Sequence, residues 1–548
     1  MWFNFLPIFL CNKIHGLVSG PLVETSGGLI RGLRAEDDGY SMFMGIPYAT
    51  VDEGNPFGSA KPHPKFENEF EAYDDTAICP QVEEFNHTIT GTLDCLHINI
   101  YVPDSATPFN KLPVLIWIHG GAFTFGFSGR YVYGPKYLIR HDIILVTLNY
   151  RLGPYGFMCL DIPEVSGNAG LKDQKLALEW IKKNIEFFSG DPDKITIYGM
   201  SAGGTSVNLH YKFGNNSLFD KLIMHSGTAL TPKIFANPDV KAALKLAKEL
   251  GLATNDNEEA VKFLSGVDPI KLIAANQALS LSYGLCVEKE FEGVEMFVSD
   301  HPLNVIGPDA SNIPVLLAYN RDEMQIAYAL MPAERFETLS DTFRNDLSKY
   351  FRVNATQLQK LETIVRQFYM GDERFSEKIR WNLGKYSSDL LFNYPAIRSI
   401  KRFVSYGSAN VYHFVFSYDG GRNYVKSRTN LTDMDMAVHA DDVGYLFDAS
   451  YMPTPSPRDQ LVIDRMTTLW ANFVKYGNPT PQQTTLLPVI WEPATDNTIP
   501  YLELGSDVHV GKRHYHDRVA FWDLFYAMNW EAQNGLNSKN NCVDTINK

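Results

Sequence analysis

Residues 195–203 read ITIYGMSAG, and this stretch gives the strongest indication of the architecture. A short apolar run leads straight into the pentapeptide G-x-S-x-G, and residues 205–213 (TSVNLHYKF) then have a helix-compatible composition. Strand, turn and helix in this order form an elbow that holds a serine in a strained conformation. Gly199 and Gly203 flank Ser201 at two residues on either side, where larger side chains would collide across the turn. Ser201 is therefore a candidate nucleophile near a helix N-terminus, which favours negative charge; a packing turn with an incidental serine is the alternative.

Five other apolar runs have the same character as the run at 195–198. They are short, rich in β-branched and aromatic residues, and without a polar alternate face: 112–118, 143–148, 221–224, 313–319 and 411–416. Such runs are typical of strands buried on both sides of a parallel sheet. Helical patterns lie between them, in residues 171–188 and 241–250, and each is followed by a glycine that can end the helix. The alternation predicts a doubly wound α/β sheet.

The remaining segments complete the predicted architecture. Residues 22–48 and 96–102 are expected to form antiparallel strands that lead into the sheet. Residues 230–400 are mainly helical in pattern, and we expect insertions that cap one face. Reactive groups in open parallel sheets gather beyond the carboxyl ends of the strands. The residues just after each apolar run are therefore the candidates for chemistry.

Residues 119–123 (HGGAF) directly follow the run at 112–118. Glycine lets the backbone turn and approach a substrate with no side chain in the way. The N–H groups of Gly121 and Ala122, together with that of Ala202, can supply the donors that a developing oxyanion needs. A glycine-rich loop that only reverses the chain is the alternative.

A serine hydroxyl is a poor nucleophile without a base, and the chain has 14 histidines. His439, in the stretch MAVHADDVGYLF beyond the run at 411–416, is the best candidate by position. In folds of this type the acid precedes the histidine in the chain. Glu323 fits that order, and the adjacent Asp322 stays open as an alternative. The other histidines that we assign are His413 in the core, His225 packed behind the site, and His514 and His516 at the surface.

Length alone would suit three or more domains, since the chain has 548 residues. The candidate nucleophile, acid and base are spread widely along the chain, however, and they must meet in one site. We therefore expect a single domain over residues 21–530 and a polar C-terminal tail over 531–548. The formal net charge of −14, with no basic block, argues against a nucleic-acid partner and against docking to an anionic membrane.

Residues 1–20 resemble a secretory signal peptide, because the nearly apolar stretch MWFNFLPIFL precedes polar and small residues. We expect secretion, and an apolar N-terminus on an intracellular protein is the alternative. No other apolar run reaches the ~20 residues that span a bilayer. Candidate N-glycosylation sites with the N-x-S/T pattern are Asn86, Asn215, Asn354 and Asn430.

Several longer phrases match one family. FMGIPYA, DCLHINIYVP, WIHGGAF, NYRLGPYGF, GDPDKITIYGMSAGG, YNRDE and LWANFVKYGNP occur in that family's order, and the match extends from about residue 21 to 525. The chain resembles the type-B carboxylesterases of the carboxylesterase/cholinesterase family, and the sequences of several of these segments are most similar to those of insect esterases. The resemblance implies the α/β-hydrolase fold, a large, mostly parallel central sheet with helices on both faces and helical insertions.

The resemblance also implies roles for individual residues. By their places in the family's motifs, the nucleophile, acid and base are Ser201, Glu323 and His439, and the oxyanion hole is formed by Gly121, Ala122 and Ala202. Ser226 falls on a serine that lies behind the family's triad, and Cys79 and Cys95 match its first disulfide. Cys159, Cys286 and Cys542 have no obvious partners, and the family's second disulfide has no evident pair.

The activity expected from these residues is hydrolysis of carboxylic esters to acid and alcohol through an acyl-enzyme. The partner would be a small-molecule ester, and the protein a monomer or homodimer. A catalytically inactive adhesion or binding protein and a lipase are the alternatives. The sequence has no H-E-x-x-H metal motif, and this chemistry needs no metal or cofactor. The chain departs from family patterns at three places. No Trp stands between Cys79 and Cys95, which argues against a choline ester as substrate. Met200 stands where juvenile-hormone esterases usually have Gln, and Met324 stands where Gly is common in the family.

Overall fold

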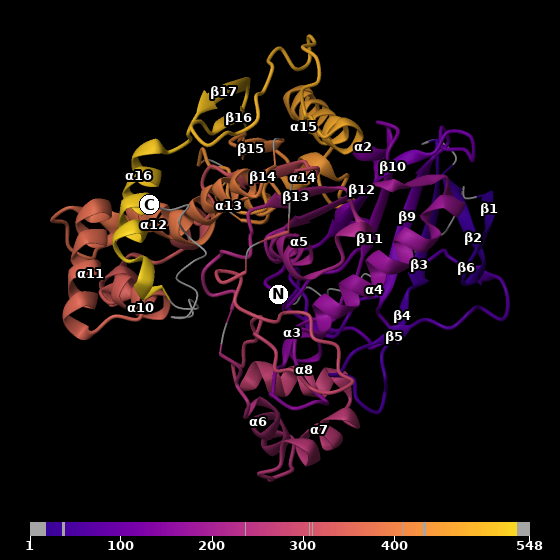
Figure 1. The fold of residues 1–548 in the computed structure, drawn as a ribbon, viewed down its shortest axis with the longest axis horizontal. Helices are drawn as coiled ribbons and strands as arrows, with labels where there is room; N and C mark the ends of the chain where they lie inside the picture. Colours follow the sequence, from indigo (N-terminus) through magenta and orange to yellow (C-terminus); the bar gives the residue numbers. More distant parts are fainter. Residues whose placement is uncertain are drawn as a thin grey trace, which may run out of the picture.

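The computed structural model describes residues 18–533 except 36–38, 236, 306, 309–310, 409, 430 and 432–433. Its centre is a 13-stranded sheet in the order β1-β2-β3-β9-β11-β10-β12-β13-β14-β15-β16-β17, with β6 paired to β2 (Figure 1). The strands of this sheet are β1 (Val18–Thr25), β2 (Gly28–Ala35), β3 (Tyr40–Pro47), β6 (Phe70–Glu71), β9 (His97–Pro103), β10 (Leu112–Ile118), β11 (Ile144–Leu148), β12 (Gly190–Met200), β13 (Lys221–His225), β14 (Val315–Asn320), β15 (Val411–Phe416), β16 (Pro500–Leu504) and β17 (Val508–Lys512). Two small sheets pair β4 (Ala49–Thr50) with β5 (Lys61–Pro62) and β7 (Gln81–Val82) with β8 (Ile89–Thr90).

The strands from β11 to β16 run parallel to their neighbours. Antiparallel strands β1, β2, β3 and β9 extend one edge, and β17 closes the other edge antiparallel to β16. The predicted, mostly parallel sheet and the antiparallel N-terminal strands that lead into it are thus confirmed. The sequence patterns missed β16 and β17, because their residues are only partly buried and form no continuous apolar run.

The helices occupy the stretches between the strands. The α-helices are α1 (Arg130–Tyr133), α2 (Lys136–Ile139), α3 (Gly153–Phe157), α4 (Ala169–Asn184), α5 (Ala202–Phe213), α6 (Ala242–Glu249), α7 (Asn257–Ser265), α8 (Pro269–Ala278), α9 (Gln325–Ala329), α10 (Thr342–Tyr350), α11 (Ala355–Met370), α12 (Arg380–Ser388), α13 (Tyr394–Ser405), α14 (Val443–Leu446), α15 (Pro457–Tyr476) and α16 (His516–Met528). The 3₁₀ helices are η1 (Ile185–Phe188), η2 (Asn216–Leu218), η3 (Ala333–Leu339), η4 (Glu377–Ile379), η6 (Lys426–Arg428) and η7 (Trp530–Ala532), and η5 (Asp389–Asn393) is a π-helix.

Both faces of the sheet are buried, because alternate residues of each central strand enter different apolar clusters. In β10, Val114 and Ile116 pack with residues of α4, α5 and α13 on one face. Leu115 and Trp117 pack with residues of α2, α14 and α15 on the other face. Side chains of successive strand residues point to opposite faces, so strands without a polar side need helices on both sides. This arrangement is the α/β-hydrolase architecture that was expected.

The helical insertions form two separate clusters. Helices α6, α7 and α8 share one apolar cluster, and α10, α11 and α12 share another with the C-terminal helix α16. Figure 1 shows the two groups at different places around the sheet. The helical insertions predicted between residues 230 and 400 are therefore present, and each group buries its own apolar side chains.

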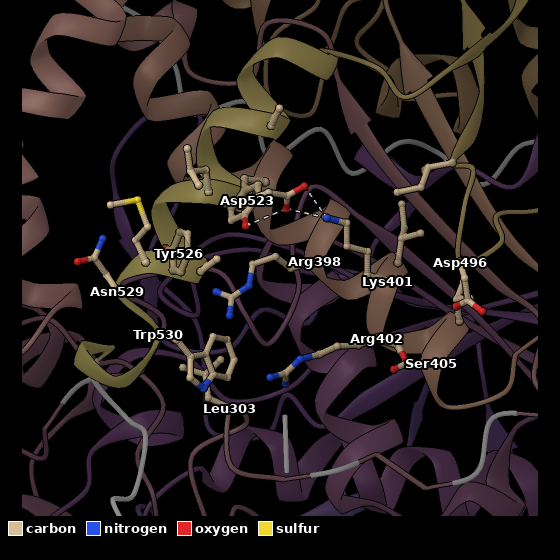
Figure 2. Close-up of a pocket in the computed structure, with 18 of the residues that line it drawn as sticks. Leu303, Arg398, Lys401, Arg402, Ser405, Asp496, Asp523, Tyr526, Asn529 and Trp530 are labelled. Atoms are coloured by element: carbon tan, nitrogen blue, oxygen red, sulfur yellow. Dashed lines mark hydrogen bonds and ion pairs between the residues drawn. The ribbon is translucent and has the colours of Figure 1, made fainter. Parts of the chain in front are cut away.

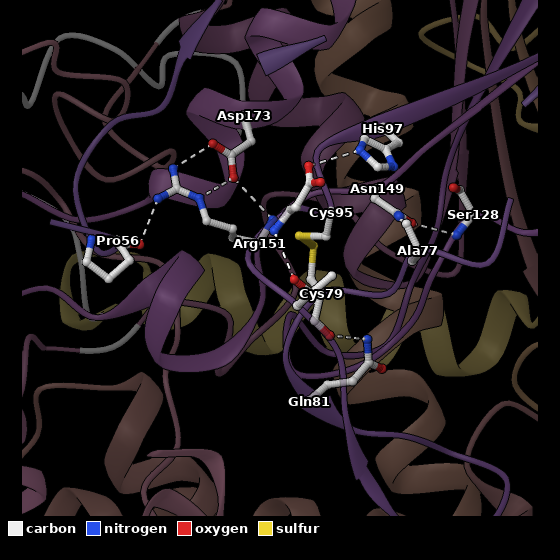
Figure 3. The surroundings of a disulfide bond; sticks show 12 residues. Pro56, Ala77, Cys79, Gln81, Cys95, His97, Ser128, Asn149, Arg151 and Asp173 are labelled. Carbon is white, nitrogen blue, oxygen red and sulfur yellow. Dashed lines mark hydrogen bonds and ion pairs between the residues drawn. A yellow bond between two sulfur atoms is a disulfide. The ribbon is translucent and has the colours of Figure 1, made fainter. Parts of the chain in front are cut away.

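One disulfide closes a short loop, and a second joins distant parts of the chain. Cys79 and Cys95 are bonded as expected, with an S–S distance of 2.03 Å (Figure 3). Cys159 and Cys286, which had no obvious partners in the sequence, are also bonded to each other, across a separation of 127 residues. That expectation was wrong because only the folded chain brings the two cysteines together. Cys542 lies outside the described residues.

Two of the other sequence expectations concern surface exposure. His413 is buried and His516 is exposed, as predicted, but His514 is only 8% exposed. The surface prediction for His514 was wrong because its Nδ1 lies 2.8 Å from the hydroxyl of Tyr319 in the core of the sheet. Among the candidate glycosylation sites, Asn86, Asn215 and Asn354 are exposed, and Asn430 lies outside the described residues.

The ends of the chain bear on localisation. Most of the expected signal segment, residues 1–17, and most of the expected tail, residues 534–548, lie outside the described residues. Within the part of the chain that is described, no helix is both long and apolar enough to cross a membrane.

Candidate active site

Ser201 stands between the end of β12 and the start of α5, at a turn that only small neighbours permit. Its backbone has φ 57° and ψ −122°, a strained conformation for a residue with a side chain. A Cβ on Gly199 would lie 2.2 Å from the backbone of Gly203, and a Cβ on Gly203 would lie 2.0 Å from the carbonyl oxygen of Ile118. The Ser201 N–H donates to the carbonyl of His225 at 2.8 Å. The elbow predicted from the sequence is present, and packing against β10 and β13 holds it.

The structure brings together the three residues predicted as nucleophile, base and acid. His439 Nε2 lies 2.9 Å from Ser201 Oγ, and His439 Nδ1 lies 2.6 Å from Glu323 Oε2. A carboxylate accepts only, so Nδ1 carries the ring proton and Nε2 presents its lone pair to the serine. The arrangement can remove a proton from Ser201 and stabilise the imidazolium that results.

Glu323, and not its neighbour Asp322, faces the imidazole. The Glu323 side chain is fully buried, and its Oε1 accepts hydrogen bonds from Ser226 Oγ and from the N–H of Asn320 at 2.8 Å. The Asp322 carboxylate turns away to pair with the guanidinium of Arg321 at 2.7 Å. The alternative that the sequence left open is therefore decided geometrically in favour of Glu323.

The glycine-rich loop after β10 lies against the elbow. A Cβ on Gly120 would stand 3.0 Å from Ser201 Cβ, so only glycine allows this approach. Gly121 and Ala122 both have positive φ, at 106° and 52°, so the backbone of the loop turns sharply at these two residues. Within the described part of the chain, the N–H groups of Gly121 and Ala122 donate to no protein acceptor. Ala202 opens α5, where first-turn N–H groups lack intrahelical partners. The three expected donors are available to an oxyanion.

The disulfide loop supports the glycine-rich loop through Gln81. Its side-chain amide donates to the carbonyl of Gly126 at 2.8 Å and accepts from the N–H of Gly126 at 2.7 Å. Figure 3 shows Gln81 beside the Cys79–Cys95 bond, with the buried ion pair of Arg151 and Asp173 nearby. The bond between Cys79 and Cys95 thus stiffens a segment that touches the loop of the candidate oxyanion hole.

Sequence reasoning missed two residues that touch the site. Asn320 is the last residue of β14 and donates to Glu323, a place that the rule about strand ends could have found. The ring of Phe392 lies 4.6 Å from the ring of His439. Phe392 belongs to the π-helix η5 in a helical insertion, and no local pattern indicates its position.

Of the cavities in the described part of the chain, one lies away from the triad and another lies near the glycine-rich loop. A cavity of about 1520 Å³ lies between α13 and α16, where Figure 2 shows the ion pair of Lys401 with Asp523 and the side chain of Arg398. None of the triad residues lines it. A second cavity, of about 650 Å³, is lined by Thr124 and Phe125, which directly follow the glycine-rich loop, and by residues of the disulfide loop and α8. This cavity offers space for a ligand near the glycine-rich loop, and neither the triad residues nor the candidate oxyanion donors line it.

The sequence matches the model of the carboxylesterase family over residues 19–522. The chain belongs to the carboxylesterase family. Juvenile hormone esterase of Heliothis virescens is 29% identical, over 92% of this chain and 94% of that protein. Esterase-5A of Drosophila pseudoobscura pseudoobscura is 30% identical, over 90% of this chain and 91% of that protein. The crystal structure of juvenile hormone esterase from Manduca sexta, with OTFP covalently attached, has a TM-score of 0.80 and 26% identity, and covers 93% of this chain and 100% of its own.

Membership of the carboxylesterase family confirms the expected activity class, a carboxylic-ester hydrolase, and the α/β-hydrolase fold. The match also covers nearly the whole span in which the sequence phrases were found. The relatives that match include insect esterases, as the sequences of those segments indicated.

Proposed function

We propose that this carboxylesterase cleaves its substrate with a Ser201–His439–Glu323 triad and an acyl-enzyme intermediate. The observation that carries the proposal is the continuous line of contacts from Ser201 Oγ to His439 Nε2 at 2.9 Å and from His439 Nδ1 to Glu323 at 2.6 Å. A nucleophile, a base and an orienting acid are the parts that such chemistry needs.

In the first half-reaction, Ser201 Oγ attacks the ester carbonyl carbon while its proton passes to His439 Nε2. The carbonyl oxygen becomes an oxyanion that accepts hydrogen bonds from the N–H groups of Gly121, Ala122 and Ala202. The carbon–oxygen bond to the alcohol then breaks, and His439 returns the proton to the leaving alcohol. In the second half-reaction, water attacks the acyl-enzyme, gives a proton to His439, and releases the acid as Ser201 regains that proton. Glu323 holds the imidazole and stabilises its charged form.

Ser201→Ala tests the nucleophile. The variant should lose at least about 10⁴-fold in kcat with a 4-nitrophenyl ester, and should not be labelled by an organophosphate. Ser399→Ala is a control for loss of a serine hydroxyl away from the site, because Ser399 is buried and its hydroxyl donates to the carbonyl of Pro395 at 2.9 Å in α13. Full activity of Ser201→Ala would overturn the triad. A well-folded wild-type protein that reacts with no active-site probe would favour the inactive binding protein instead.

We propose a small-molecule ester as the substrate, with the cavity beside Thr124 and Phe125 as part of its binding space. Hydrolysis rates for 4-nitrophenyl esters of increasing acyl length measure the size of that space. A juvenile hormone should be assayed as well, because two of the relatives are named juvenile hormone esterase. A jump in tributyrin hydrolysis above the solubility limit would indicate a lipase. We also propose secretion after removal of an N-terminal signal segment, which N-terminal sequencing of protein from culture medium would test.

A further inference from the structure

His225 lies directly beneath the catalytic elbow, and it belongs to a buried polar cluster that reaches all three triad loops. It ends β13, its side chain is fully buried, and its carbonyl oxygen accepts the N–H of Ser201 at 2.8 Å. Its Nε2 lies 3.0 Å from Asn320 Oδ1, and its Nδ1 lies 3.2 Å from Asp442 Oδ2. Asn320 precedes Glu323 by three residues, and Asp442 follows the base by three residues.

The orientation of the Asn320 amide is determined by its other contacts. Its Nδ2 lies 2.7 Å from the carbonyl oxygen of Val438 and 3.0 Å from Asp442 Oδ1. A carbonyl oxygen can only accept, so the NH₂ group must point there. Asn320 Oδ1 therefore faces His225, and His225 Nε2 must carry a hydrogen to donate to it.

A proton must also lie between His225 Nδ1 and Asp442 Oδ2. The two atoms are 3.2 Å apart, and neither has another hydrogen-bond partner among the described residues. If the imidazole were neutral and the carboxylate ionised, two lone pairs would face each other in a fully buried place. Either an imidazolium beside a carboxylate or a neutral imidazole beside a carboxylic acid removes that conflict. Both forms have the same net charge, which is zero.

We propose that His225 and Asp442 hold one proton between them at neutral pH, and that this uncharged pair is a positioning element for the triad. The proposal rests on the proposed role of the triad itself. An ionised Asp442 without His225 would be a further buried carboxylate near the base, in addition to Glu323. A negative charge there would favour the protonated, inactive form of His439. The pair keeps the hydrogen bonds of that carboxylate without adding its charge.

The other titratable groups around the pair are also acidic. Tyr198 of β12 is buried, and burial raises the pKa of its phenol well above the usual value. The Asp441 carboxylate accepts the N–H of Val438, and burial raises the pKa of Asp441 to about 7. Glu323 adjoins the cluster through the N–H of Asn320.

Aromatic rings close the remaining sides of His225. Trp470 of α15 and Phe414 of β15 have ring centroids 6.2 and 6.4 Å from the imidazole. In the described part of the chain, no lysine or arginine pairs with Asp442, so His225 is the group that can neutralise it. This role explains why a histidine stands at the end of β13.

Three variants separate charge from shape. His225→Gln keeps an amide that can donate a hydrogen bond but removes the group that holds the proton. Asp442→Asn offers an NH₂ group to Nδ1 of a neutral imidazole, so the net charge stays at zero. The double variant His225→Gln/Asp442→Asn removes both groups. His413→Gln is the matched control, because His413 is equally buried but faces no triad loop.

The measurement is the pH dependence of kcat/KM with a 4-nitrophenyl ester, per active site titrated with an organophosphate. The acid limb of this profile reports the free enzyme. For His225→Gln it should move to higher pH by about one unit. Asp442→Asn, the double variant and His413→Gln should keep the wild-type acid limb.

An unmoved acid limb in His225→Gln would overturn the proposal. If the acid limb of Asp442→Asn moved to lower pH by about one unit, the proposal would also be overturned, because that shift would show that Asp442 carries an uncompensated charge in the wild type. This variant provides the test if His225→Gln does not fold. A wild-type enzyme without activity, or an active Ser201→Ala variant, would instead overturn the proposed triad, so the two failures are distinguishable.

Discussion

Removal of the Ser226 hydroxyl should slow catalysis without disturbing substrate binding. This hydroxyl is one of three donors to the buried carboxylate of Glu323, beside the N–H of Asn320 at 2.8 Å and His439 Nδ1 at 2.6 Å. A hydrogen bond to a charged group contributes about 1.5–3 kcal/mol. If that support is lost where Glu323 stabilises the imidazolium, the barrier rises by a similar amount, which corresponds to a roughly 10–100-fold lower kcat. KM should change little, because Ser226 lies behind Glu323 and not in front of Ser201.

Two substitutions at position 226 distinguish the hydroxyl from the backbone. Ser226 has φ 49°, in the left-handed region, so alanine retains the strain of a Cβ there and glycine relieves it. Both Ser226→Ala and Ser226→Gly should lower kcat to a similar extent, with Ser399→Ala as the control for loss of a buried hydroxyl. Steady-state kinetics with a 4-nitrophenyl ester, corrected for titrated sites, measures the effect. Wild-type kcat in both variants would refute the reasoning, and a loss in Ser226→Ala alone would assign the effect to backbone strain.

Glu323→Gln should lower kcat much more than Asp322→Asn, because only Glu323 contacts the imidazole, at 2.6 Å; steady-state kinetics of the two variants compares them. Replacing Cys159 and Cys286 by serine should reduce the free energy of unfolding by up to about 5 kcal/mol, since the bond closes a loop across 127 residues, and urea unfolding curves measure the loss. Acidification should also destabilise the fold. Burial lowers the pKa of His119 to about 4 from 6.5. Between these two pH values the His119 side chain is therefore protonated in the unfolded chain but neutral in the folded protein. The contribution of His119 to the free energy of unfolding is therefore fully present above pH 6.5 and falls by about 1.4 kcal/mol per pH unit between 6.5 and 4. Thermal unfolding should accordingly give a lower Tm at pH 5 than at pH 7.

The elbow could be predicted from the sequence because its constraint is local. Gly199 and Gly203 are needed where a Cβ would meet backbone at 2.2 and 2.0 Å, so small residues must stand at a fixed spacing around Ser201. The buried strands were predictable for a similar reason, since burial on both faces requires an unbroken apolar run. Local steric and burial rules therefore suffice for the nucleophile and for the centre of the sheet.

Long-range pairings could not be read in the same way. Cys159 and Cys286 meet across 127 residues, and nothing near either cysteine indicates the other. His514 sits in the polar stretch KRHYHDR, yet Tyr319 from β14 offers it a buried hydrogen bond at 2.8 Å. The substitution Met324, where the family commonly has glycine, is harmless because its φ of −104° suits any residue. Such outcomes depend on the neighbour that the fold supplies, which composition and spacing do not encode.

The position of the base depends on contacts that cross the sheet. Neighbouring strands lie about 4.8 Å apart, so β12 and β15, three places apart in the sheet, are separated by about 14 Å. His439 follows β15 and yet reaches Ser201 at 2.9 Å, so its loop must fold back across β14 and β13. Two hydrogen bonds hold the loop there, from the His439 N–H to the Glu323 carbonyl at 3.0 Å and from Asn320 Nδ2 to the Val438 carbonyl at 2.7 Å. Because the partners of the loop in these two bonds are Asn320, the last residue of β14, and Glu323, three residues beyond it, the catalytic geometry is set by the end of a sheet strand as well as by the loop that carries the histidine.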